Sequence, residues 1–119
     1  MKEFLGSQTP AVIMHNLKIK WWQRANYLQA FAAESEVAPG QLAITCNLSR
    51  NVIYDYLKLA QALEKRPSLR LVTKKRTALA ILRSQDTNRM LANYIRARKR
   101  KIGLEKLVEE YQDSGVTYE

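Results

Sequence analysis

Six polar side chains lie along one side of a predicted helix over residues 49–60, opposite its apolar residues. Arginine can donate two hydrogen bonds to guanine, and asparagine can form two with adenine. We therefore expect Arg50 and Asn51 to contact base edges, although a helix face of this kind can also be merely solvated. Lys58 is better suited to a phosphate oxygen. The predicted base-reading residues are Ser49, Arg50, Asn51, Tyr54 and Asp55.

The residues before and within this helix follow a pattern of two crossing helices joined by a tight turn. Asn47 occupies the turn, where left-handed backbone is required and asparagine is tolerated next after glycine. Ser49 can cap the second helix through its hydroxyl. The pattern predicts a helix-turn-helix over residues 38–60, whose second helix would lie in the major groove of DNA. Small or apolar residues occupy the contact positions: Leu42, Ala43, Cys46, Leu48, Ile53, Tyr56 and Leu57.

A second group of candidate residues is the basic segment Thr73–Arg76. With Thr73 as the N-cap of a helix, Lys74, Lys75 and Arg76 would occupy its first turn. The helix dipole makes three cations there unfavourable unless an anion binds beside them. We expect all four residues to contact phosphate. The alternative is a helix that begins near Thr77, with the cations in a loop.

A third group of cations surrounds the end of a later helix rather than following one face. Cations near a helix C-terminus also interact favourably with its dipole, which accounts for part of the group. The excess favours phosphate binding, and an arginine-rich helix facing RNA is the alternative. These residues are Arg96, Arg98, Lys99, Arg100 and Lys101.

The distribution of charge supports a polyanionic partner. The 119-residue chain has a net charge of +9 and a pI near 9.9. Residues 58–101 hold fourteen basic and two acidic side chains, whereas residues 102–119 hold one basic and five acidic. Nucleic acid is the simplest partner for the middle segment. No membrane partner is expected, because no basic segment has a strong apolar face and no apolar run approaches about 20 residues.

The pattern of apolar residues predicts an all-α fold, a compact multi-helix domain built around the helix-turn-helix. Only three prolines and four glycines interrupt the chain, and no segment alternates apolar and polar residues over the length of a strand. The predicted helices cover residues 10–17 after an N-cap at Thr9, 18–33, 38–47, 49–66 up to Pro67, and 73–83. A sixth helix is capped by Asp86 or Thr87, and Gly103 weakens the chain before the last helix over 104–111. The predicted parts are an N-terminal arm with a short helix over 1–17, the DNA-binding domain over 18–112 and a frayed acidic tail over 113–119.

No catalytic or metal site is expected, and no cofactor. His15 has no nearby set of ligands, and Cys46 falls on the packing side of the predicted motif, so a buried thiol in a reducing cytosol is the simplest reading. Trp21 shares a helix face with Ala25 and is expected in the core. Trp22 points elsewhere and is expected to be half-buried or to serve a partner.

Together these elements resemble the central DNA-binding domain of ParB-type partition proteins, the group that includes KorB-like repressors. The resemblance covers roughly residues 20–110. It departs from the family at Arg98–Arg100, where a Gly-Leu-Ser-like turn is usual. The larger members' nucleotide-binding domain has no counterpart here, so CTP-driven clamping is not implied. The matching segments are Gln41–Ala43, Asn47–Ile53, Tyr56–Leu59 and Thr73–Arg83, with Gln23–Ala25 where the family has Glu-Glu-Ala.

The resemblance implies sequence-specific binding of double-stranded DNA, in plasmid or chromosome partition or in transcriptional repression. It also implies a partition motor protein as a partner, and a cytoplasmic protein associated with the nucleoid or a plasmid. The segment Leu104–Tyr111 is the candidate for forming a homodimer. The alternative function is non-specific binding of nucleic acid, in DNA packaging or to RNA, driven by residues 58–101. A protein-interaction module that has lost DNA binding is a third reading.

Overall fold

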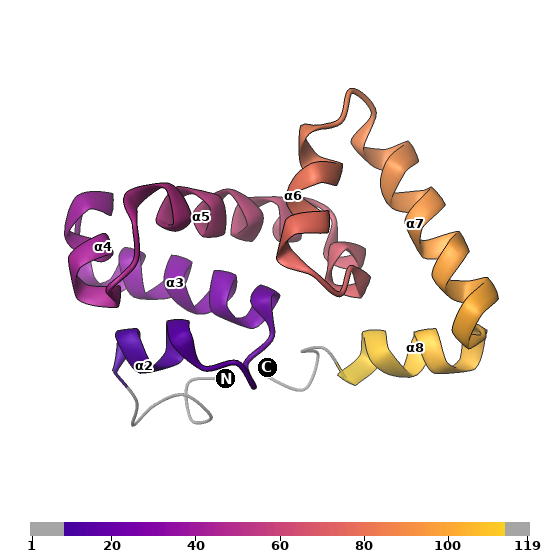
Figure 1. Cartoon of the computed structure of the whole chain (residues 1–119), viewed down its shortest axis with the longest axis horizontal. Coiled ribbons are helices and arrows are strands. Elements are labelled where there is room, and N and C mark those ends of the chain that lie inside the picture. Colours follow the sequence, from indigo (N-terminus) through magenta and orange to yellow (C-terminus); the bar gives the residue numbers. More distant parts are fainter. Residues whose placement is uncertain (1–8, 114–119) are drawn as a thin grey trace. The chain divides into compact units, whose positions relative to one another are not determined.

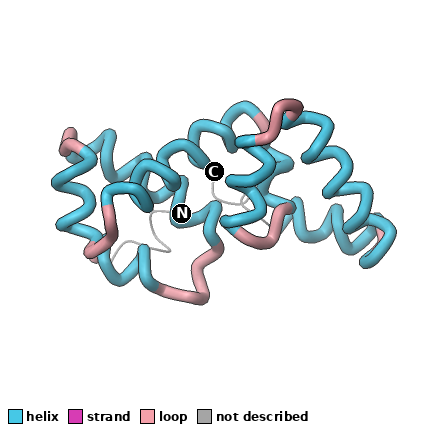
Figure 2. Tube along the Cα trace, turned by 45° about the horizontal axis from the view of Figure 1, so that its top comes forward, coloured by secondary structure: helices cyan, strands magenta, loops and turns pink. Residues whose placement is uncertain are grey.

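The computed structural model describes residues 9–113, and this part of the chain is helical with no strand (Figure 2). The predicted all-α class is confirmed. Residues 1–8 of the predicted arm and 114–119 of the predicted tail lie outside the described residues. The elements are α2 (Pro10–His15), α3 (Trp21–Ser35), α4 (Pro39–Cys46), α5 (Arg50–Lys65), the 3-10 helix η1 (Pro67–Leu71), α6 (Lys75–Arg83), α7 (Thr87–Ile102) and α8 (Leu104–Asp113).

The chain forms two compact units, Met1–Gln61 and Ala62–Glu119, and the boundary between them falls within α5. The first unit contains α2, α3, α4 and most of α5, drawn from indigo to magenta in Figure 1. The second contains η1, α6, α7 and α8. Sequence alone predicts one domain over 18–112 and does not locate this boundary, because the helical pattern of α5 continues without a break across Gln61.

Local capping sets the helix boundaries of the first unit. The Thr9 hydroxyl accepts a hydrogen bond from the Val12 amide, as predicted for an N-cap followed by proline. Helix α3 begins at Trp21 instead of near Lys18, because Asn16 first closes a turn by accepting from the Lys18 amide. The helix ends where Glu36 takes left-handed backbone, at φ 54° and ψ 38°.

The core of the first unit brings α2, α3, α4 and α5 together. Trp21 and Trp22 are both buried. The prediction that Trp22 is half-buried or serves a partner is wrong, because the residue is only 3% exposed. Cys46 is fully buried, as predicted. The fully buried large side chains of this unit are Ile13, Leu28, Leu42, Cys46, Ile53 and Leu59.

In the second unit, Pro67 ends α5 as predicted but also starts η1, which sequence did not indicate. Asp86 caps α7, its carboxylate accepting from the Arg89 amide at 3.1 Å. Gly103 ends α7 with φ 89° and ψ 154°, a conformation essentially restricted to glycine. Helix α8 therefore starts in a new direction, as the bend between α7 and α8 in Figure 1 shows. Leu69, Val72 and Ala78 are fully buried in this unit.

Candidate nucleic-acid interface

The turn between α4 and α5 consists of Asn47–Ser49 and has the hydrogen bonds of a Schellman motif. Asn47 has φ 57° and ψ 48°, which confirms the predicted left-handed turn residue. The Leu48 amide donates to the Ala43 carbonyl at 3.0 Å, and the Asn47 amide donates to the Ile44 carbonyl at 3.2 Å. These two bonds use carbonyls that the end of α4 would otherwise leave unpaired. The turn therefore has a fixed geometry.

Ser49 starts α5 in the predicted way. Its hydroxyl accepts a hydrogen bond from the Val52 amide at 3.3 Å, and its carbonyl accepts the first helical bond, from the Ile53 amide. This bond gives the side chain a structural role at the N-cap. The cap bond uses one acceptor site of the Ser49 hydroxyl and leaves its hydrogen and a second acceptor site available.

Most of the predicted base-reading side chains share the exposed face of α5. Arg50, Asn51 and Lys58 are exposed, and Tyr54 is 51% exposed. Because α-helices turn about 100° per residue, these four positions fall within about 100° of one another. Asp55 lies at the edge of this face and is half-buried, so it has less access to DNA than predicted. Ile53 and Tyr56 are buried on the opposite side.

The guanidinium group of Arg50 lies beside Gly40 in the first turn of α4. A Cβ atom built on Gly40 would be 3.1 Å from the Nη2 atom of Arg50. Because Arg50 is the first residue of α5, its side chain reaches from the start of α5 to the first turn of α4. This contact could not be predicted from sequence, because nine residues separate the pair.

His15 braces the turn from α2. Its Nε2 atom is 3.0 Å from the carbonyl oxygens of both Cys46 and Asn47. Both oxygens are acceptors, so Nε2 must carry the hydrogen. The sequence argues against a metal-binding or catalytic role for His15, and it does not indicate this structural role. The helical periodicity of a short segment carries no signal for a contact across 31 residues.

Arg24 holds α5 against α3. One of its terminal nitrogens donates to the Asn16 carbonyl, and the other donates to the Tyr56 hydroxyl at 3.3 Å. The Nε atom of Arg24 is buried without a hydrogen-bond partner in the described part of the chain. Arg24 is therefore a structural cation of the first unit, linking α3 to α5 and to the residue that follows α2.

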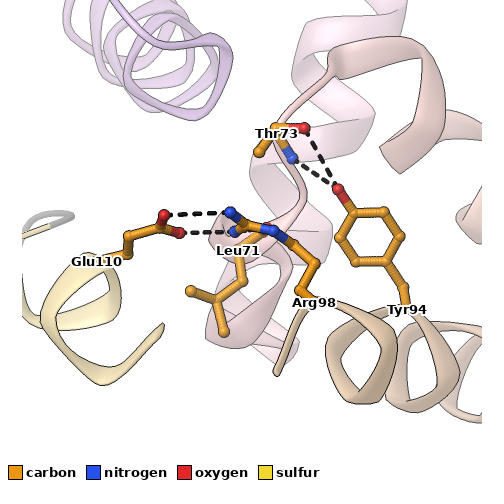
Figure 3. A network of polar contacts seen from close by, with 5 residues as sticks. All are labelled: Leu71, Thr73, Tyr94, Arg98 and Glu110. Atoms are coloured by element: carbon orange, nitrogen blue, oxygen red, sulfur yellow. Dashed lines mark hydrogen bonds and ion pairs between the residues drawn. The ribbon is translucent and has the colours of Figure 1, made fainter. Parts of the chain in front are cut away.

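The basic segment before α6 differs from the prediction in its cap. Thr73 is not the N-cap: its amide and hydroxyl both pair with the Tyr94 hydroxyl, at 3.2 and 3.3 Å (Figure 3). The N-cap is Lys74, in extended backbone with no side-chain cap bond. Lys75 and Arg76 are the first two residues of α6, so the helix begins two residues before Thr77. Lys75 is half-buried, whereas Lys74 and Arg76 are exposed.

Arg98 is committed to an intramolecular network and does not fit the predicted phosphate set (Figure 3). Its guanidinium pairs with both carboxylate oxygens of Glu110, at 2.6 and 3.1 Å, and donates to the Leu71 carbonyl at 3.1 Å. Hydrogen bonding to Glu110 raises the pKa of Arg98 above its ordinary value. The side chain is only 17% exposed. The remaining members of this group, Arg96, Lys99, Arg100 and Lys101, are exposed.

The described residues show no other built site. Between residues 9 and 113, no three His, Cys, Asp or Glu side chains are grouped as metal ligands would be. None of the helices in this part of the chain combines the length and apolar character needed to cross a membrane. Burial raises the pKa of the Cys46 thiol above its ordinary value. A raised thiol pKa disfavours the nucleophilic thiolate.

No protein-family model matches the chain, and no curated protein or solved structure matches it either.

Proposed function

We propose that this chain is a sequence-specific double-stranded DNA-binding protein of helix-turn-helix type. The observation that carries the proposal is the fixed turn over Asn47–Ser49, followed by a helix whose exposed first turns present Arg50 and Asn51. In helix-turn-helix proteins the N-terminal part of the second helix contacts base edges. Arginine and asparagine are the residue types that form paired hydrogen bonds with guanine and adenine.

Within this proposal, phosphate contacts position the protein and base contacts supply the selectivity. Lys58 on α5 is the proposed phosphate ligand of the first unit, and the exposed cations Lys74 and Arg76 are proposed phosphate ligands of the second. Thr73 and Arg98 are left out of this set, because their polar groups are paired within the chain.

The resemblance to ParB-type and KorB-like proteins supports a role in partition or in repression, acting at a plasmid or the nucleoid in the cytoplasm. Partition would require a dimer and a motor protein. Helix α8 is the proposed dimer element, because Leu104 and Val108 are 54% and 44% exposed on it. Sedimentation of a monomer at high micromolar concentration would remove the dimer from the proposal.

The experiment is selection from a random duplex library at about 150 mM salt, where non-specific binding is weak. We expect a sequence motif to be recovered, with selectivity lost in Arg50→Ala by roughly tenfold or more, since one bidentate base contact is worth about 1–3 kcal/mol. Lys18→Ala is the matched control, since Lys18 is an exposed cation of the same unit outside α5. Strong binding without any motif would contradict the proposal.

That outcome would favour the second candidate, a non-specific nucleic-acid-binding protein. The observation in its favour is the charge of the second unit: residues 62–119 hold fourteen basic and seven acidic side chains.

A further inference from the structure

Three arginines form a line along the solvent side of α7. Arg89, Arg96 and Arg100 are all exposed. Their spacings of seven and four residues place them within about 40° of one another around the helix axis, and about 16 Å apart from first to last. Leu91, on the opposite side of the helix, is buried. We call Arg89, Arg96 and Arg100 the arginine ridge; Arg89 is a member that the sequence did not single out.

No acidic side chain neutralises the ridge within its own helix. Helix α7 contains six basic residues and no acidic residue, and only Arg98 among the six turns inward, to Glu110. Solvated helices commonly combine both signs of charge in pairs four residues apart. In the described residues, the three ridge arginines have no ion pair, and Arg96 is held only by a hydrogen bond to Asn93 at 3.0 Å.

The side chains around the ridge indicate which polyanion it fits. Ala92, Asn93 and Ala97 are exposed beside the arginines, and all three are small. Small neighbours let a phosphate backbone approach the helix closely. The ridge has no aromatic side chain on which an unpaired base could stack, and no apolar stripe that would enter a lipid surface. These features fit the backbone of a duplex.

We infer that the arginine ridge of α7 is a second DNA-binding surface, which contacts duplex phosphates without reading their sequence. It goes beyond the proposed reading by α5, because it belongs to the other unit and needs no target site. Duplex DNA carries one negative charge per about 1.7 Å of axis, so a ridge about 16 Å long meets several phosphates.

The test compares two double variants that lose the same charge from the second unit. Arg96→Gln with Arg100→Gln removes most of the ridge, and Lys65→Gln with Lys106→Gln removes two exposed cations outside it. Affinity of the full chain for a duplex without a target site is measured between 50 and 200 mM salt. The logarithmic salt dependence has a slope of about −0.9 per phosphate neutralised. We expect the ridge variant to reduce the magnitude of the slope by about 1.8 and the control to change it little.

A third variant, Arg96→Lys with Arg100→Lys, keeps both charges and should keep the slope of the unmodified chain. Equal reductions in the ridge and control doubles would overturn the inference, because net charge alone would then explain binding. Preferential binding of single-stranded nucleic acid or RNA would overturn it as well. Because the duplex has no target site, the result does not depend on Arg50, and loss of selectivity in Arg50→Ala tests the proposed function separately.

Discussion

The two units differ most in charge. Residues 1–61 hold six basic and four acidic side chains, whereas residues 62–119 hold fourteen basic and seven acidic. The unit with the turn and the exposed reading face is therefore nearly neutral, and the other carries most of the excess charge. Phosphate contacts supply affinity without sequence information, and base contacts supply selectivity. Under the proposed function, the second unit would supply most of the affinity and the first unit would supply the selectivity.

The units also use their arginines differently. In the first unit, Arg24 is a structural cation and Arg50 is exposed. In the second unit several arginines have partners within the chain. Arg66 donates to Asn88 at 2.7 Å, Arg70 lies over the Tyr111 ring at 5.9 Å, and Arg98 pairs with Glu110. Fewer cations are therefore available to a ligand than the number of basic residues in the sequence.

The largest effect is expected from Arg24→Ala in the first unit. The substitution removes the hydrogen bonds to the Asn16 carbonyl and the Tyr56 hydroxyl, and charged hydrogen bonds of this kind contribute about 1.5–3 kcal/mol. We expect a loss of roughly 2–3 kcal/mol in the free energy of unfolding, measured in urea through the fluorescence of Trp21 and Trp22. Lys18→Ala is the control, and an equal loss there would contradict the assignment.

A pair of glycine substitutions should act with opposite signs in the two units. Gly103→Ala places a side chain at φ 89°, so we expect a loss of about 1–3 kcal/mol even though no atom lies within 4 Å. Gly40→Ala has no such backbone restriction, and only the end of the flexible Arg50 side chain must move. We expect Gly40→Ala to gain about 0.4–1 kcal/mol. Denaturant titration of both variants tests the contrast, and a stabilising Gly103→Ala would refute it.

His15→Ala should weaken the turn that presents α5. It removes the donor shared by the Cys46 and Asn47 carbonyls, and we expect a loss of about 1 kcal/mol in the free energy of unfolding. Leu17→Ala is a suitable control, because Leu17 is 92% exposed. Hydrogen exchange of the Leu48 amide would locate the effect. Unchanged exchange at that amide would show that His15 does not brace the turn.

Glu110→Gln tests how α8 is held in the second unit. It weakens the bidentate pair with Arg98, and we expect a loss of up to about 1 kcal/mol, because the Glu110 side chain is 39% exposed and the pair is partly screened. Glu109→Gln is the control, because it makes the same change at the preceding residue, which is exposed. The thermal midpoint of Glu110→Gln should be lower than that of Glu109→Gln. Matching midpoints would mean that the pair does not stabilise this unit.

The smallest expected effect is a loss of stability at alkaline pH. Burial raises the pKa of the Cys46 thiol above its ordinary value of 9.0, and burial also raises the pKa of Tyr27 above 10.0. The unfolded chain then releases protons first, so stability is full below about pH 9 and falls as the pH rises. The free energy of unfolding measured from pH 7 to 10 should fall less steeply in Cys46→Ala. An identical pH dependence would contradict this cause.

Sequence predicted the parts of the fold that depend on local chemistry. Asn47 in the turn, Ser49 at an N-cap and Gly103 at a break all have local backbone reasons, and the structure confirms them. Of the two caps predicted for α7, Asp86 and Thr87, the structure has Asp86. Prediction from sequence failed where a partner far away in the chain determines the local structure. Thr73 hydrogen-bonds to the Tyr94 hydroxyl, 21 residues away, instead of capping α6.

The same limit applies to the candidate site. The polar face of α5 follows from helical spacing, and so could be predicted. The contact of Arg50 with Gly40, the donation by His15 and the pairing of Arg98 with Glu110 depend on tertiary packing. A count of basic residues cannot separate cations that the fold uses from those that stay exposed.

The most direct test measures the ratio of affinities for a selected duplex site and a scrambled duplex. It compares Arg50→Ala with the double variant Arg96→Gln and Arg100→Gln. We expect Arg50→Ala to lower this ratio by roughly tenfold or more, the value of one base contact. The ridge variant should weaken binding to both duplexes and leave the ratio unchanged. A lower ratio in the ridge variant, or an unchanged ratio in Arg50→Ala, would contradict the proposal that the two units supply affinity and selectivity separately.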